Sequence, residues 1–107
     1  MTASRLAIEH SLEGRELPQD TPVRCADCGT NLREGALVTV AATEHDGGVW
    51  RLSDVWCAGD GPVPWKYDGD ADVLAEGSLG LASDVRSQRH YPILVCATVL
   101  NGKRVEA

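Results

Sequence analysis

Hydrophobic and polar positions alternate in two neighbouring segments of the chain, and this alternation predicts a β-hairpin. Residues 36–44 are rich in β-branched side chains, which favour a pleated strand, and residues 49–57 follow with the same two-residue period. Residues 45–48 between them read His-Asp-Gly-Gly, which supplies the Asp-Gly and Gly-Gly chemistry of tight turns. If the turn holds an even number of residues, one face carries Val38, Val40, Val55 and Cys57, and the other carries Leu37, Trp50, Leu52 and Trp56.

Residues 71–82 are expected to form a further strand. Apolar and polar side chains alternate along this segment, as in a half-buried strand. Asp70 and Gly77 would also suit the start and the stop of a short helix. We prefer a strand in which Gly77 or Gly80 marks a bend or a bulge.

Residues 91–100 are apolar on both faces, which predicts a central, buried strand. Two other stretches are expected to lack regular structure. Residues 1–24 are polar and end in Pro18 and Pro22, which rule out a regular helix there. Residues 58–70 are punctuated by glycine and proline and are therefore interpreted as a loop.

Together these elements predict a mainly β protein: a small antiparallel β domain built on the hairpin and extended by the two later strands. The 107 residues suffice for one domain with one modest core, so we expect a single domain over residues 1–107. That core is poor in large side chains, because the chain has no Phe, two Tyr and three Trp. Small side chains bury little apolar area at roughly 25 cal/mol per Å². A metal would therefore contribute more to stability here than in a Phe-rich domain.

The formal net charge of −6 and a sequence pI near 4.9 make this an acidic protein. This acidity argues against broad binding to nucleic-acid phosphates, which depends on Lys and Arg, although a local basic patch stays open. Arg far exceeds Lys, and Asp, Ala, Gly and Val are abundant, which indicates a GC-rich genome and a salt-loving, halophilic host. An ordinary acidic bacterial protein is the alternative.

The chain is expected to be cytoplasmic and not to enter a membrane. No segment approaches the ~20 apolar residues of a membrane span, and the start lacks the apolar run of a signal peptide. Thiols stay reduced in the cytoplasm, so clustered cysteines there are more often metal ligands than disulfides.

Three cysteines carry the candidate chemistry. Cys25 and Cys28 form a CxxC pair followed by Gly29. Two intervening residues let both thiolates point at one tetrahedral ion, and Gly29 tolerates the positive φ of such a turn. Cys57 closes the predicted hairpin, which returns the chain toward this pair. A fourth ligand is then expected at position 60, where the chain has Asp60.

This stretch, from Cys25-Ala-Asp-Cys28-Gly29 through the Val-rich strand to Trp56-Cys57-Ala-Gly-Asp60, resembles a zinc ribbon. More loosely, it is similar to small zinc-finger-like proteins of haloarchaeal genomes. The resemblance covers residues 23–62 and implies Zn²⁺ in a structural site. It departs from the full pattern of two CxxC pairs at its last ligand, where an aspartate oxygen would replace a sulfur. The implied ligands are Cys25, Cys28, Cys57 and Asp60.

Other fourth ligands stay open, and a decayed site that binds no metal is a further possibility. Cys96 is a weaker candidate, because a cysteine in an apolar strand is usually a buried core residue. The histidines that could complete the site are His10, His45 and His90.

Other chemistry is less well supported by the sequence. A three-cysteine site with a bound water would resemble catalytic zinc, but the chain lacks both the H-x-E…P-C-x-x-C and the H-E-x-x-H patterns. A redox role for the CxxC pair lacks its usual βαβ setting. The acidic run 68–72 lacks the glycine and glutamate that a calcium loop needs at its sixth and twelfth positions. We therefore expect no enzyme.

The function expected from the sequence is that of a protein-interaction domain, an adaptor or accessory module with a structural metal site and an unidentified protein partner. Arg86, Arg89 and His90 form a basic cluster that could contact an anion or this partner. Trp65 lies among loop-like residues and could offer an exposed ring, whereas Trp50 and Trp56 are expected in the core. The alternatives are a nucleic-acid-associated zinc ribbon in transcription or RNA handling and, lower, a catalytic zinc enzyme.

Overall fold

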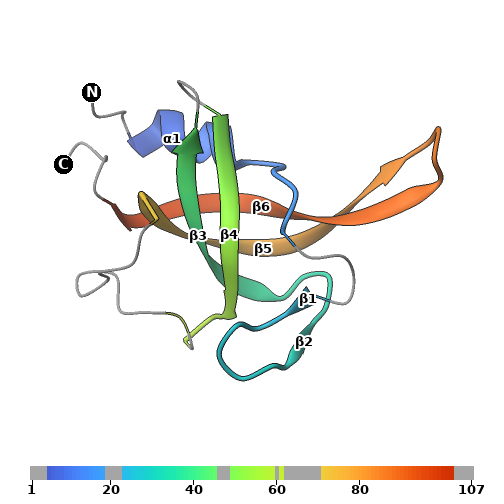
Figure 1. The fold of residues 1–107 in the computed structure, drawn as a ribbon, viewed down its shortest axis with the longest axis horizontal. Coiled ribbons are helices and arrows are strands. Elements are labelled where there is room, and N and C mark those ends of the chain that lie inside the picture. Colours follow the sequence, from blue (N-terminus) through green and yellow to red (C-terminus); the bar gives the residue numbers. More distant parts are fainter. Residues whose placement is uncertain (1–4, 19–22, 46–48, 60, 62–70, 103–107) are drawn as a thin grey trace.

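The computed structural model describes residues 5–18, 23–45, 49–59, 61 and 71–102, and the side chains of these residues up to 100. This part of the chain is mainly β, as the alternation of the sequence predicts, and it also contains one short helix (Figure 1). The elements are helix α1 (Arg5–Leu12) and strands β1 (Val23–Arg24), β2 (Asn31–Leu32), β3 (Leu37–His45), β4 (Val49–Cys57), β5 (Val73–Asp84) and β6 (Arg89–Gly102). Within these ranges no helix combines the length and the apolar character needed to cross a membrane.

The longer strands form one antiparallel sheet in the order β4-β3-β5-β6, and the short strands β1 and β2 form a separate pair. The predicted hairpin is confirmed: His45 pairs with Val49 next to the turn, and Val38 pairs with Cys57 at the other end. The β5–β6 hairpin runs well beyond β3 and β4 as a two-stranded arm (Figure 1). The sheet therefore places Cys57 at one end of the molecule, next to β1 and β2.

Gly77 lies where the pairing of β5 with β6 shifts register, so the predicted bulge at this glycine is confirmed. A Cβ atom at position 77 would lie 2.6 Å from the backbone oxygen of Val95 and 2.7 Å from Cδ1 of Leu94. No larger side chain fits there unless β6 moves, which explains why a glycine interrupts an otherwise regular strand.

The predicted faces of the β3–β4 hairpin are correct at the Cys57 end and wrong near the turn. The register shifts by one residue where β4 carries an additional residue, Ser53. A one-residue bulge inverts the alternation of side chains beyond it. Trp50 and Leu52 therefore lie in the main core together with Val38 and Val55, instead of on the opposite face.

Strand β6 lies at an edge of the sheet, so the prediction of a central strand was wrong. The chain preceding β1 covers this edge. The Gly14 N–H donates to the Leu94 carbonyl over 2.7 Å, the Leu94 N–H donates to the Arg15 carbonyl over 3.0 Å, and the Leu17 N–H donates to the Pro92 carbonyl over 2.9 Å. An edge strand can thus be as apolar as a central one, because another segment shields it.

Helix α1 falls in the stretch that was expected to lack regular structure, and Pro18 and Pro22 both come after its end. Its buried residues, Ile8 and Leu12, are four positions apart and share one face of the helix. This spacing was the signal that could have revealed the helix.

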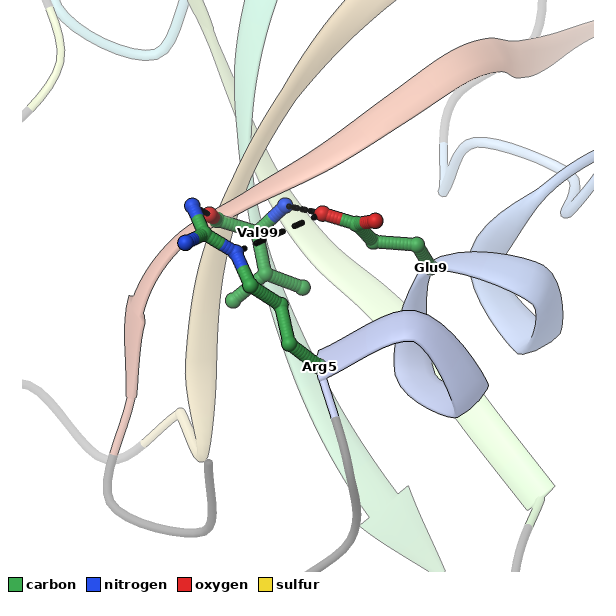
Figure 2. A network of polar contacts seen from close by, with 3 residues as sticks. All are labelled: Arg5, Glu9 and Val99. Carbon is green, nitrogen blue, oxygen red and sulfur yellow. Dashed lines mark hydrogen bonds and ion pairs between the residues drawn. The ribbon is translucent and has the colours of Figure 1, made fainter. Parts of the chain in front are cut away.

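Two side chains of α1 also bind the backbone of β6 (Figure 2). The Val99 N–H donates to Glu9 Oε2 over 2.8 Å, and Arg5 donates to the Val99 carbonyl. Arg5 and Glu9 pair with each other at 3.6 Å.

The main core lies on one face of the sheet and is built largely of aliphatic side chains. A small second cluster on the opposite face contains Ala41, Ala71 and Leu74, with Trp56 packed against it. The main core contains Ile8, Leu12, Leu17, Val23, Cys25, Leu32, Val38, Val40, Ala42, Trp50, Leu52, Val55, Val73, Ala75, Leu79, Leu94 and Val99.

Candidate metal centre

Cys25 and Cys28 lie in the tight turn that joins β1 to β2. The Gly29 N–H donates to the Cys25 carbonyl over 3.0 Å, and the Cys25 N–H donates to the Thr30 carbonyl over 3.0 Å. Gly29 has a φ of 73°, in the left-handed region, as the CxxCG pattern predicts. We refer to residues 25–30 as the knuckle.

Cys57, the last residue of β4, completes a group of three thiols. The knuckle docks on the edge of β4 through the Ala26 N–H, which donates to the Val55 carbonyl over 2.8 Å. Cys28 Sγ then lies 3.6 Å from Cys57 Sγ. The Sγ atoms of Cys25, Cys28 and Cys57 all lie within 4.8 Å of one another, so the group could hold a metal ion.

The three thiols differ in exposure, so the cluster has a protein side and a solvent side. Cys25 is 3% exposed and belongs to the main core, Cys57 is half-buried, and Cys28 is exposed. A metal held by all three would consequently sit at the surface of the core, with one side toward solvent.

Hydrogen bonds to sulfur favour a thiolate at Cys25. Its Sγ accepts the Asp27 N–H at 3.4 Å and the Cys57 N–H at 3.3 Å. Burial alone would raise the pKa of the Cys25 thiol, but backbone N–H donors, including that of Cys28, outweigh it and lower the pKa from 9.0 to about 7.

Cys57 shows the opposite behaviour. Burial, hydrogen bonds with the other two thiols and their charges together raise the pKa of Cys57 from 9.0 to about 12. The group therefore resists full ionisation at neutral pH unless a positive charge is added. A metal cation would supply that charge, and thiolate ligands bind it as the protons leave.

Thr30 is a member of the cluster that the sequence reasoning missed. The Cys28 thiol lies 3.1 Å from Thr30 Oγ1, within hydrogen-bonding distance. The signal was available in the sequence, because a threonine two residues after the second cysteine lies on the same turn.

The structure brings together three of the four predicted ligands, and the fourth, Asp60, lies outside the described residues. Trp65 and residues 68–70 of the acidic run also lie outside them. In the part of the chain that is described, no histidine, carboxylate or further cysteine has a ligand atom within 4.8 Å of all three sulfurs. The alternatives that this leaves out of the group are His10, His45, His90 and Cys96.

The prediction that Cys96 is a buried core thiol was wrong. Cys96 is exposed and adopts a φ of 56°, which is uncommon for a residue other than glycine. It lies in the stretch of β6 where the pairing with β5 shifts register at Gly77. The bulge turns the Cys96 side chain out of the alternating pattern, which is why its burial could not be inferred from its apolar neighbours.

The basic cluster of Arg86, Arg89 and His90 lies at the tip of the β5–β6 arm, and all three residues are exposed. Carboxylates lie among them, so the tip is not uniformly positive. Contact of this tip with an anion or a partner stays a prediction. The neighbours of the three are Asp84, which accepts the Arg86 N–H at 3.0 Å, Glu16, which pairs with Arg89 at 3.3 Å, and Ser83, whose Oγ lies 2.9 Å from His90 Nδ1.

Residues 2–102 match the family described as Domain of unknown function (DUF8112). No curated protein and no solved structure shows a match to the chain. Because the family match spans nearly the whole sequence, including the knuckle, both long hairpins and α1, the chain belongs to the DUF8112 family.

Proposed function

We propose that this chain is a small zinc-binding domain in which a structural metal fastens the knuckle to the end of β4. We further propose that it acts as a protein-interaction domain of the adaptor or accessory kind, without catalytic activity.

The distances between the cysteine sulfurs carry the zinc part of the proposal. Zinc binds thiolates at about 2.3 Å in a tetrahedral arrangement, which corresponds to sulfur–sulfur distances of about 3.8 Å. The distance of 3.6 Å between the sulfurs of Cys28 and Cys57 is close to that value. The Cys25 sulfur lies within 4.8 Å of the other two sulfurs. Binding of zinc to all three therefore needs no large movement of the backbone.

Asp60 is our proposed fourth ligand. It follows Cys57 by three residues, the separation that also joins Cys25 to Cys28. Aspartate oxygen is an accepted zinc ligand, although sulfur and imidazole nitrogen are more common in structural sites.

The weakness of β1 and β2 supports a structural rather than a catalytic metal. Each strand has two residues, and such a short pair is not stable by itself in water. A metal ligated by Cys25, Cys28 and Cys57 would connect this pair to β4 and so to the main sheet. The ion would then contribute directly to the free energy of folding.

The β5–β6 arm supports the binding-module part of the proposal. Its tip carries Val85, whose side chain is 89% exposed, next to Arg86 and close to Arg89. An apolar residue flanked by charges on a projecting hairpin suits contact with another protein. Binding to nucleic acid would instead weaken steeply with added salt, so titration with partner candidates at two ionic strengths distinguishes the two classes.

Metal analysis of the purified protein tests the zinc proposal. We expect near-stoichiometric zinc in the wild type and in Cys96→Ser, the matched control that changes a cysteine outside the cluster. Zinc should be lost in Cys25→Ser and Cys57→Ser and weakened in Asp60→Ala. A folded wild-type protein that takes up no zinc would refute the proposal, and unchanged zinc in Asp60→Ala would remove Asp60 from the ligand set.

A further inference from the structure

We propose that the cysteine cluster is a redox-sensitive latch, in which a hydroperoxide joins Cys28 to Cys57 in a disulfide and releases the metal. This inference rests on the proposed function, because it concerns the regulation of the same site. It assigns different roles to the three cysteines, and that difference makes it testable.

Cys28 and Cys57 lie close enough to form a disulfide. The sulfurs of Cys28 and Cys57 lie 3.6 Å apart, and a disulfide needs about 2.05 Å. Cys28 belongs to an exposed turn, so a small movement of its side chain can close this gap. No rearrangement of the sheet is required, because Cys57 already lies at the end of β4 beside the knuckle.

Exposure determines which sulfur reacts first. Cys28 is exposed, and its thiol contacts the Thr30 hydroxyl at the surface. An oxidant in solution therefore reaches Cys28 directly. Cys57 is half-buried but adjacent, which places it to resolve the oxidised sulfur rather than to meet the oxidant itself.

Cys25 is less ready than Cys28 and Cys57 to be oxidised and to form a disulfide. It is 3% exposed, and its sulfur accepts the N–H groups of Asp27 and Cys57. A disulfide to Cys28 would draw this sulfur toward the surface and away from its two N–H donors. The CxxC pair suggested by the sequence is thus not the pair that the structure favours.

The reaction balances with the two metal-bound thiolates, one hydroperoxide and two protons from solvent. The Cys28 sulfur attacks the hydrogen-bearing oxygen of the peroxide and the O–O bond breaks. The leaving hydroxide, or the alkoxide of an alkyl hydroperoxide, takes a proton from solvent and becomes water or an alcohol. Cys28 is then a sulfenic acid. The Cys57 sulfur attacks it, the S–S bond forms, the S–OH bond breaks, and the second hydroxide takes a proton from solvent and leaves as water. The two sulfurs have given up two electrons and the peroxide has accepted them.

When Cys28 and Cys57 form a disulfide, Cys25 is the one remaining cysteine ligand. A site with one thiolate binds zinc much more weakly than a site with three, so the ion is released. The new disulfide joins the same two elements as the metal, since Cys28 is in the knuckle and Cys57 ends β4. Oxidation would therefore replace the metal link between the knuckle and β4 by a disulfide link, while the fold persists. A thiol reductant and zinc would reverse the exchange.

The test uses the zinc-loaded Cys96→Ser protein, because Cys96 is the exposed thiol outside the cluster. The sample is titrated with hydrogen peroxide while a chromogenic chelator reports zinc release, and the disulfide is located by peptide mass spectrometry. We expect zinc release in step with the loss of two hydrogen atoms from the intact mass, and a peptide pair that contains Cys28 and Cys57. Dithiothreitol and zinc should restore the starting state.

Three results would overturn the latch. These are a disulfide that joins Cys25 to Cys28, over-oxidation to sulfinic acid without a disulfide, and zinc that stays bound after the disulfide forms. Zinc content before peroxide is added tests the proposed function separately. If the starting protein carries no zinc, the proposed function and the metal-release step both fail, and the mapped disulfide then tests the pairing of Cys28 with Cys57 by itself.

Discussion

Glu13 of the chain after α1 holds the bulge of β6 at Cys96. Its carboxylate accepts the Cys96 N–H at 2.9 Å through Oε1 and the next backbone N–H, that of Ala97, at 3.0 Å through Oε2. Glu9 binds the Val99 N–H in the same way, as Figure 2 shows. Beyond the part of the β6 edge that the preceding chain covers, acidic side chains thus occupy positions that a neighbouring strand would otherwise fill. They protect this part of the edge from pairing with another chain.

Replacement of Glu13 by Ala should destabilise the fold by about 2 kcal/mol, because two backbone donors lose a charged acceptor. Glu13→Gln keeps one acceptor oxygen, so its free energy of unfolding should fall by about half as much. The control is Glu16→Ala, whose carboxylate pairs with Arg89 on the surface and should cost below about 1 kcal/mol. Urea unfolding of the zinc-saturated variants measures these differences. Equal stability of the Glu13 and Glu16 variants would show that the bulge does not depend on this carboxylate.

Gly77→Ala should destabilise the sheet by about 2 kcal/mol, since the added Cβ would overlap the Val95 carbonyl and the Leu94 side chain. Gly80→Ala is the matched control on the same strand. Its Cβ would meet Val95 Cγ1 at 3.1 Å, a side-chain atom that can move aside, so we expect a loss below about 1 kcal/mol. Thermal unfolding of both variants tests the difference, and a Gly77→Ala protein as stable as the control would contradict the close approach of β5 and β6.

Removal of zinc should loosen the knuckle before it affects the main sheet. The stabilisation by zinc is about 4 kcal/mol when its concentration is on the order of 1000 times the dissociation constant. Amide hydrogen exchange with and without chelator should show lost protection at Cys25 and Gly29, which are bonded within the knuckle. Protection in the β3–β5 pairing, where Val40 faces Ala75, should remain. Unchanged exchange in the knuckle would mean that the metal is not what holds it.

The stability of the metal-free protein should rise between about pH 7 and pH 9, because the pKa of Cys25 is lowered from 9.0 to about 7 in the folded state. In that window the unfolded chain binds more protons than the folded chain, so higher pH favours folding, and this contribution is lost as the pH falls through 7. The raised pKa of Cys57 has the opposite effect above pH 9, since the folded state then retains a proton that the unfolded state releases.

Urea unfolding across this range, in the presence of chelator, measures the pH dependence. Cys25→Ser is the control, because it removes the thiol that causes the rise and leaves Cys57 in place. A rise of the same size in Cys25→Ser would assign the pH dependence to other groups.

Local chemistry was enough to locate the candidate metal ligands that the structure describes. The CxxCG pattern predicts a knuckle with a left-handed glycine, and Gly29 has that conformation. The chain reverses between His45 and Val49, as the sequence predicts, and this reversal brings Cys57 back toward Cys25 and Cys28. Each of these features depends on interactions between residues that are close in sequence or joined by one hairpin, so a sequence pattern is sufficient to predict them.

The sequence did not predict which segments pack around the hairpin or which side chains face the core beyond each bulge. Only the tertiary structure shows this. An apolar strand such as β6 must be shielded, but its composition does not say whether a neighbouring strand or the segment carrying α1, Glu9 and Glu13 provides the shield. The bulge at Ser53 likewise places Trp50 on the core face. The alternation of apolar and polar residues around Ser53 does not reveal this bulge. The sequence by itself determined which residues form the hairpin and which thiols meet, because short-range geometry sets both. The partners of the outer strand and the faces beyond each bulge were decided by packing between distant segments.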